Sequence, residues 1–389
     1  MKYDFENIVD RHALNSMKWS NPDKDSISMS IADMDFKVCP EIKEALIKAV
    51  NAQNYGYTDI PKEYFLAFRR WFSKYHNITY NTNDMVFATG VVPIISSCVR
   101  KLTTPNENVC LLTPNYNIFY NSIVNNGCRI LASELIYKDG VYSIDFEDLE
   151  AKLADPQTNL FILCNPHNPI GKIWSKEELR KIGKLCLKYH VTVISDEIHC
   201  DITEPNKNYV PFLSVDESFK ENTIVCVSTT KAFSSPGTHH ALAIVPNKFL
   251  FNKVNRALNT DEVAECNFIA CQAAIAALNK GRDWLEEMKQ KISENRKLAT
   301  ELLLKDAPHL KVIKADSTYL MWVDCSYYTD DCDRLCKVLE REHKLTVGKG
   351  SVYGSNSKAF VRINLATNTA TLKEGLRRFL IPFRLLKTN

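Results

Sequence analysis

The sequence predicts an α/β fold built on a mostly parallel sheet, with a smaller α+β unit after it. Short, continuous apolar runs, many rich in β-branched residues, alternate with segments of helical spacing in the first part of the chain. Continuous runs are typical of strands covered on both faces, and alternation of strands with helices indicates a parallel sheet. The expected strands are 108–114, 160–166, 191–197, 224–230 and 240–246.

Before and between these runs, the sequence predicts an irregular arm and several helices. The first 35 or so residues show no periodicity, which predicts the arm. Pro40 suits the first position of a helix, and Ser175 with Glu178 forms the pattern of a capping box. The helices expected here are 39–50, 64–76 and 175–190.

After about residue 280 the pattern changes to that of a smaller α+β unit. In chain order we expect a helix over 284–305, a strand over 317–324, a helix over 331–341, a strand over 360–366 and a final helix. The predicted division is an N-terminal arm with part of the small domain over 1–47, a large domain over 48–280 and a C-terminal small domain over 281–389.

Composition points away from nucleic acid and membrane partners. The net charge is +3 and basic residues are interspersed with acidic ones. No apolar run reaches the ~18 residues of a membrane span, and the first residues lack the apolar stretch of a secretory signal. The thirteen cysteines form no disulfide framework, so we expect reduced thiols and a cytoplasmic location. Cys332 and Cys336 lack a second ligand pair nearby, so no metal site is expected.

Polar residues stand at or just after the carboxyl ends of three of the expected strands. In parallel sheets a ligand binds at the carboxyl ends of the strands, so chemistry is expected where these residues meet. They are Asn165 and Asn168 for the strand 160–166, Asp196, Glu197 and His199 for the strand 191–197, and Ser228, Thr230 and Lys231 for the strand 224–230.

Lys231 stands directly after a run that reads as a buried strand. A desolvated lysine has a lowered pKa, and its neutral amine forms Schiff bases with carbonyl compounds. The alternative is a lysine that extends from the strand end to water. Residues 228–231 also match the Ser-x-x-Lys pattern of penicillin-recognising serine hydrolases. The partner motifs match poorly, however, and here the pattern closes a strand instead of opening a helix.

Asp196 adds a second element to the lysine. It could simply cap the next turn, but a buried carboxylate needs a cation or strong donors. A lysine Schiff base with an Asp partner to a pyridinium nitrogen is the arrangement that binds pyridoxal phosphate. The Asn-Pro units of 164–171 would hold an asparagine amide beside such a ring, and Gly90 precedes a helix whose free N-terminus suits a phosphate. Arg362 would bind a carboxylate, either of a substrate or within the protein.

These residues converge on a known family. The motifs "TGVVP", "TPNYNIFY", "NPHNPIGKIWSKEEL", "SDEIHCD", "STTKAFS" and "FVRINLA" resemble, in this order, those of the fold-type I pyridoxal-phosphate enzymes of the class I/II aminotransferase group. The resemblance implies a mostly parallel seven-stranded sheet in the large domain, which would bind pyridoxal 5′-phosphate.

Within that group the chain resembles the MalY/PatB branch of cystathionine β-lyases and C–S lyases. The similar motifs are "IADMDF" at 31–36, "DEIHCD" at 196–201 and "NYGYTD" at 54–59. Three positions depart from the usual patterns. Ser20 replaces an aspartate, the Cys-Pro-Arg that often follows the Arg362 motif is missing, and His239 stands where many aminotransferases have a phosphate-binding arginine.

The resemblance also implies residue roles. Lys231 would be the catalytic lysine that holds the cofactor covalently, and Arg362, with Asn168, would bind the substrate. Tyr57 would reach the phosphate in the partner subunit, which implies a homodimer with shared active sites. The other implied cofactor contacts are Asp196 to the pyridine nitrogen, Asn168 to the ring hydroxyl, Tyr116 stacked on the ring, Gly90, Val91, Val92 and Ser228 at the phosphate, and His199.

Two reactions fit these roles. The branch implies β-elimination of L-cystathionine or related cysteine S-conjugates to pyruvate, ammonia and a thiol. The alternative is transamination of an L-amino acid, because Lys231 can move a proton in both reactions. A third class is a non-enzymatic regulator that kept the fold. The intact set of Lys231, Asp196, Asn168 and Arg362 argues against that class.

Overall fold

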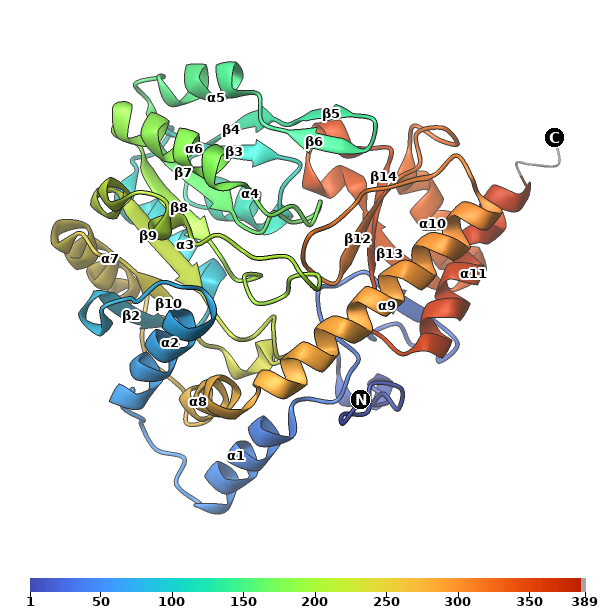
Figure 1. Ribbon diagram of the computed structural model, residues 1–389, viewed down its shortest axis with the longest axis horizontal. Helices are drawn as coiled ribbons and strands as arrows, with labels where there is room; N and C mark the ends of the chain where they lie inside the picture. The colour runs from blue at the N-terminus through green and yellow to red at the C-terminus, as the bar shows by residue number, and fades with distance from the viewer. Residues whose placement is uncertain (386–389) are drawn as a thin grey trace.

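The computed structural model describes residues 1–385 and contains two large sheets (Figure 1). The larger is the seven-stranded, mostly parallel sheet that was expected. Only β10 runs antiparallel to its neighbours β2 and β9. In spatial order its strands are β2 (Met85–Ala88), β10 (Ala241–Ile244), β9 (Thr223–Val227), β8 (Thr192–Asp196), β7 (Thr158–Cys164), β3 (Asn108–Thr113) and β4 (Arg129–Glu134).

Each of the five predicted runs is a strand of this sheet, in its interior. Both edge strands lay outside the predicted runs. One edge, β2, has only four residues, and the other, β4, is mostly exposed or half-buried. Neither therefore carries the long, continuous apolar pattern of a strand covered on both faces.

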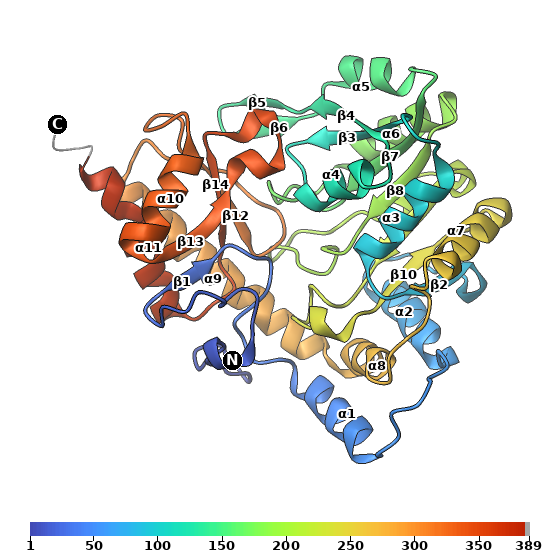
Figure 2. The ribbon, with the colours of Figure 1, turned by 180° about the vertical axis from the view of Figure 1, so that it is seen from behind.

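Helices cover both faces of this sheet. Figure 2 shows α3 (Val91–Leu102), α4 (Asn117–Val124) and α7 (Lys248–Thr260) on one face, where they share an apolar layer with the strands. The opposite face carries α2 (Lys62–Tyr75), α5 (Phe146–Leu153), α6 (Lys176–Lys188) and α8 (Ala270–Lys280). The predicted capping box of α6 is confirmed: Glu178 N–H donates to Ser175 Oγ, and Ser175 N–H donates to Glu178 Oε2.

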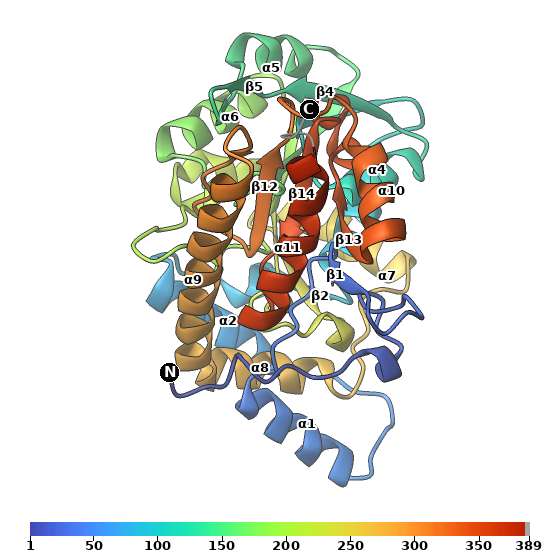
Figure 3. The same cartoon turned by 90° about the vertical axis from the view of Figure 1, so that its right-hand side faces the viewer.

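The second sheet has five strands and belongs mainly to the C-terminal part. Its strand β1 comes from the N-terminal segment and pairs in parallel with β13. Figure 3 shows α9 (Arg282–Asp306) and α11 (Thr369–Leu385) against it, with α10 (Cys332–His343) nearby. In spatial order the strands are β1 (Ile27–Met29), β13 (Leu345–Lys349), β14 (Phe360–Asn364), β12 (Leu320–Asp324) and β11 (Lys311–Val312).

One further helix and one hairpin lie between these elements along the chain. Helix α1 (Pro40–Asn51) leads from the N-terminal segment toward α2, and the hairpin of β5 (Ile136–Lys138) and β6 (Val141–Ser143) follows β4. The N-terminal arm is largely irregular, as predicted, apart from β1 and one 3₁₀ turn at His12–Leu14. Over residues 1–385, no helix combines the length and the apolar character that a membrane crossing requires.

Candidate active site

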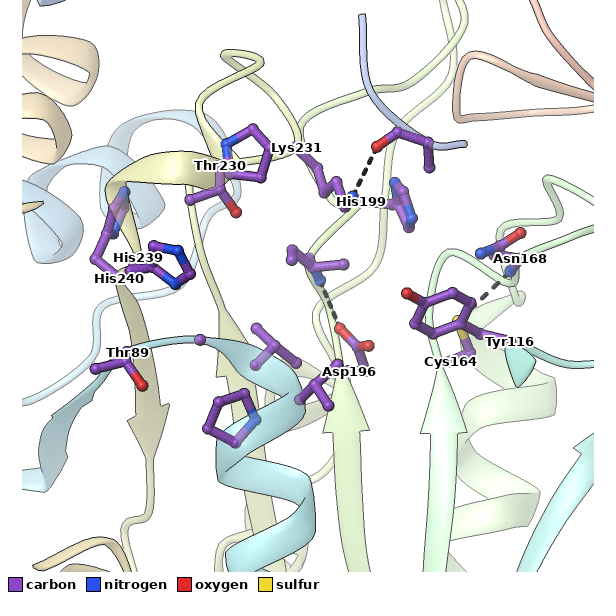
Figure 4. Close-up of a pocket in the computed structure, with 17 residues that line it drawn as sticks. Thr89, Tyr116, Cys164, Asn168, Asp196, His199, Thr230, Lys231, His239 and His240 are labelled. Atoms are coloured by element: carbon purple, nitrogen blue, oxygen red, sulfur yellow. Dashed lines mark hydrogen bonds between the residues drawn. The ribbon is translucent and has the colours of Figure 1, made fainter. Parts of the chain in front are cut away.

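A cavity of about 290 Å³ lies at the carboxyl edge of the seven-stranded sheet. Figure 4 shows side chains reaching it from the ends of β7 and β8, from the turn after β9 and from the start of α3. This is the edge at which parallel sheets bind their ligands. Of the residues expected at the site, the lining includes Gly90, Val91, Val92, Tyr116, Asn168, Asp196, His199 and Lys231.

Lys231 enters this cavity from the turn that follows β9. Its Nζ donates a hydrogen bond of 2.7 Å to the backbone carbonyl of Ala32, which belongs to the N-terminal segment. Burial lowers the pKa of Lys231 to about 8, although the carboxylates of Asp33 and Asp196 partly oppose this shift. Roughly a tenth of this amine is therefore neutral and nucleophilic at pH 7, a far larger fraction than for an ordinary lysine.

Asp196 ends β8 and points into the same cavity (Figure 4). Burial raises the pKa of its carboxyl to about 7, and its Oδ1 accepts a hydrogen bond of 3.0 Å from Ile198 N–H. Within residues 1–385 no lysine, arginine or histidine forms an ion pair with it. A buried carboxylate without a cationic side chain as partner fits a protonated ring nitrogen, because such a donor would supply the missing positive charge.

Arg362 lies on β14 of the second sheet and is 5% exposed. Its Nη1 donates to Asn168 Oδ1 (3.1 Å), its Nη2 donates to the Ser30 carbonyl (2.9 Å), and its guanidinium lies over the Tyr353 ring. In the described part of the chain it forms no ion pair, and its buried Nε has no hydrogen-bond partner. The internal ion pair that the sequence left open is thus not formed, and the cation is available to an external carboxylate.

Tyr116 and His199 place two aromatic side chains in the lining of the cavity. Tyr116 caps α4, and its side chain lies beside Asn168 in Figure 4. His199 is buried, and burial lowers the pKa of its imidazole to about 3, with Lys231 and Arg362 adding to the shift. The ring is therefore neutral at physiological pH, and its Nδ1 has no hydrogen-bond partner within residues 1–385.

The start of α3 forms the anion-binding end. Gly90 caps the helix, and Val91 and Val92 provide its first-turn N–H groups beside the cavity. Two hydroxyl residues that the sequence did not mark as phosphate contacts, Thr89 and Thr230, also line this end. Thr89 directly precedes Gly90, and Thr230 directly precedes Lys231, so their position next to predicted residues is the available signal.

Two other predicted residues, Ser228 and Tyr57, lie outside the lining of the cavity. Ser228 is not among the lining residues, and its hydroxyl donates to the His240 carbonyl at 2.6 Å. His239 and His240 both line the cavity. Tyr57 lies on the segment between α1 and α2, is fully exposed and does not reach the cavity of its own chain.

One cluster outside the cavity has side chains of the metal-ligating types. His76, Cys200 and Asp201 bring potential ligand atoms within 4.8 Å of one another. The Asp201 carboxylate already accepts hydrogen bonds from His76 and from Trp71 Nε1, at 2.7 and 2.8 Å. The cluster is therefore explained as a buried hydrogen-bond network. Cys332 and Cys336 lie on α10, away from this cluster.

This architecture, two sheets with a lysine at the carboxyl edge of the larger one, is that of the pyridoxal-phosphate-dependent aminotransferase-like fold. The chain belongs to the family "Aminotransferase class I and II", which it matches over residues 24–379. The expected family is thereby confirmed.

Three relatives are informative. The chain is 36% identical to the cystathionine β-lyase PatB of Bacillus subtilis, an alignment that covers 96% of this chain and 98% of PatB. Cystalysin from Treponema denticola, a structure containing pyridoxal 5′-phosphate, superposes with a TM-score of 0.96 at 29% identity and 100% coverage of both chains. The pyridoxal-phosphate-bound C–S lyase of Staphylococcus hominis gives a TM-score of 0.91 at 29% identity, with 98% of each chain covered.

Proposed function

We propose that this protein is a pyridoxal-phosphate-dependent C–S lyase that cleaves L-cystathionine or related cysteine S-conjugates. The observation that carries the proposal is that the amine of Lys231 and the unpaired carboxylate of Asp196 share one cavity with Asn168. The unpaired guanidinium of Arg362 reaches this cavity from the second sheet through its hydrogen bond to Asn168. The similarity to PatB and to the Staphylococcus hominis C–S lyase favours elimination over transamination.

The residues present fit the cofactor. Lys231 would hold it covalently, Asp196 would keep a proton on its ring nitrogen, and the start of α3 would hold its phosphate with Thr89 and Thr230. Tyr116 would stack on the ring, and Asn168 would bind the ring hydroxyl. Bound pyridoxal phosphate supplies a ring system that accepts the electron pair released at the substrate α-carbon.

The chain's own groups would then carry out the remaining work. The Arg362 guanidinium binds the substrate α-carboxylate in a bidentate manner and orients the α-carbon toward the cavity. Lys231 Nζ removes the α-proton once its amine is free. Breaking of the bond between the β-carbon and sulfur releases the thiolate, which leaves as a thiol after protonation. Addition of water to the remaining three-carbon unit gives pyruvate and ammonia.

The test is a product assay on the loaded protein. With L-cystathionine or an S-alkyl-cysteine and no 2-oxoacid, the protein should release pyruvate, ammonia and a thiol in equal amounts. A strict requirement for 2-oxoglutarate or another acceptor, with no thiol released, would leave the aminotransferase alternative. A protein that stays colourless after pyridoxal phosphate is added would favour the non-enzymatic regulator.

We further propose the organisation and location that the sequence predicts. The domains are 1–47, 48–280 and 281–389, the assembly is a homodimer in which Tyr57 serves the partner's site, and the location is cytoplasmic. The two separate sheets support the division. The joint exposure of Tyr55 and Tyr57 on one segment supports the dimer, because grouped exposed aromatic side chains are typical of interaction surfaces.

A further inference from the structure

Residues 30–36, here called the strap, cross over the candidate active site and contact three separate parts of the chain. The Ala32 carbonyl accepts from Lys231 Nζ at 2.7 Å and from Tyr319 Oη at 3.0 Å. The Ser30 carbonyl accepts from Arg362 Nη2 at 2.9 Å. The strap is thus the one backbone segment, among the described residues, whose carbonyls hold both the proposed catalytic lysine and the proposed substrate-binding arginine.

Further contacts tie the strap to the second sheet. Asn364, two residues after Arg362 on β14, donates from Nδ2 to the carbonyls of Ile31 and Asp33, at 2.6 and 2.8 Å. Asp35 N–H donates to the Ala366 carbonyl at 2.9 Å. A shift of the strap would therefore move backbone that is in contact with Arg362 and Lys231 together.

The strap is fixed from its other side by a buried carboxylate. Asp35 Oδ1 accepts from Lys18 Nζ at 2.9 Å and from Trp19 Nε1 at 2.8 Å, and the side chains of Lys18 and Asp35 are each 1% exposed. Lys18 Nζ also donates to the Asp33 carbonyl at 3.0 Å. Breaking such a pair leaves an uncompensated buried charge, so the pair strongly restrains the strap. Arg11 adds an ion pair with Asp33.

We propose that Asp35, held by Lys18 and Trp19, is a positioning residue for the reaction because it fixes the strap. The carbonyls of Ala32 and Ser30 then hold the Lys231 amine and the Arg362 guanidinium at a fixed position relative to each other. This inference rests on the proposed function. It also gives a physical reason for the joint presence of the Lys18-Trp19 pair and the 31–36 motif, because the two meet at one carboxylate.

The test compares Asp35→Asn with Glu6→Gln. Both replace a carboxylate by an amide and break an ion pair of the N-terminal arm, since Glu6 binds Lys291 on α9. Of these two carboxylates, only Asp35 belongs to the strap. A displacement of reacting groups by about 1 Å can cost on the order of 100-fold, so we expect Asp35→Asn to lower kcat/KM at least tenfold. Glu6→Gln should stay within about twofold of the parent, even where it lowers the unfolding midpoint equally.

A second readout needs no turnover. In the apoprotein, acetylation of Lys231 by acetic anhydride, measured by peptide mass spectrometry against pH, reports the pKa of this amine. The charged and titratable groups around it are Asp33, Asp196, Arg362 and His199. The Ala32 carbonyl and the Asp33 carboxylate favour the ammonium form. Asp35→Asn should therefore lower the midpoint by about half a pH unit or more, whereas Glu6→Gln should leave it unchanged.

The outcomes separate the two proposals. Asp35→Asn matching Glu6→Gln in both kcat/KM and labelling midpoint would overturn the positioning role, while activity that survives Lys231→Ala would overturn the proposed function itself. Trp19→Phe removes one donor to Asp35 and keeps the ring. If Asp35→Asn does not fold, Trp19→Phe is compared with Glu6→Gln by the same two measurements, with the same criteria.

Discussion

At the scale of single residues, we expect activity to depend most strongly on Lys231, because one amine would both hold the cofactor and move the α-proton. Lys231→Ala should therefore reduce turnover to a few per cent of the parent or less, while the far-ultraviolet circular dichroism and the unfolding midpoint stay close to the parent. Lys253→Ala, on the exposed part of α7, is the matched control and should be fully active. Substantial turnover in Lys231→Ala would contradict the assignment.

Asp196 should show a conflict between stability and activity. Burial raises the pKa of this carboxyl from 3.8 to about 7, so the folded apoprotein binds its proton more tightly than the unfolded chain does. The resulting stabilisation is complete below the unfolded pKa and is lost as the pH rises through about 7. At pH 8 the ionised group is a cost, and Asp196→Asn should raise the free energy of unfolding of the apoprotein, by up to about 4 kcal/mol.

The same substitution should abolish most activity, on the order of 10³-fold, because the ring nitrogen would lose its charged partner. Denaturant unfolding of the apoprotein at pH 5 and pH 8, together with steady-state kinetics, measures both effects. Apoprotein that is no more stable than the parent at pH 8, with turnover near the parent's, would show that Asp196 only caps the turn through Ile198 N–H.

At the scale of elements, the loop after β7 depends on one glycine. Gly171 has a φ of +68°, and a Cβ there would lie 2.5 Å from Ala315 Cβ and 2.9 Å from the Ser317 carbonyl. Its own carbonyl accepts hydrogen bonds from the N–H groups of Asp316 and Ser317. These bonds join the loop that carries Asn168 to the segment that leads into β12 of the second sheet. Gly171→Ala should lower the free energy of unfolding by about 2–4 kcal/mol.

Gly140→Ala is the control for backbone strain alone. Its φ is +84°, but nothing lies within 4 Å of the added Cβ. It should therefore cost only about 1 kcal/mol, the usual penalty of a positive φ for an L-residue. Equal losses for the two variants in urea unfolding would mean that the contact with Ala315 is relieved by a small backbone shift.

The elements also show which parts of the fold could be predicted from the sequence. The interior strands β3, β7, β8, β9 and β10 were predictable because strands buried on both faces have continuous apolar runs. The two-residue strand β11 was not, because it is too short to show a period. The motif at 31–36 was visible, but its contact with Lys231 spans 199 positions of sequence. Neither propensity nor periodicity reports a contact at such a separation.

At the scale of the whole molecule, Tyr57 is the residue whose proposed role involves the partner subunit. It is fully exposed and Tyr55 near it is 59% exposed. The end of the cavity that is proposed to hold the phosphate is lined in the same chain by the start of α3, Thr89 and Thr230. A side chain that completes the partner's site would explain this exposure. The protein should then sediment as a twofold-symmetric dimer at assay concentration, and an active monomer would contradict the shared site.

Mixed dimers give the sharper test, because they distinguish a dimer whose subunits share active sites from a dimer whose subunits only associate. Tyr57→Ala and Lys231→Ala homodimers should both be impaired, the first in cofactor affinity and the second in turnover. In a heterodimer of the two, one site would combine the intact Lys231 of one chain with the intact Tyr57 of the other. Unfolding and refolding an equal mixture should form heterodimers in half of the molecules, each with one native site, so about a quarter of the parent activity should return. If Tyr57 served the site of its own chain, no site in the mixture would be native, and activity would stay at the average of the two homodimers.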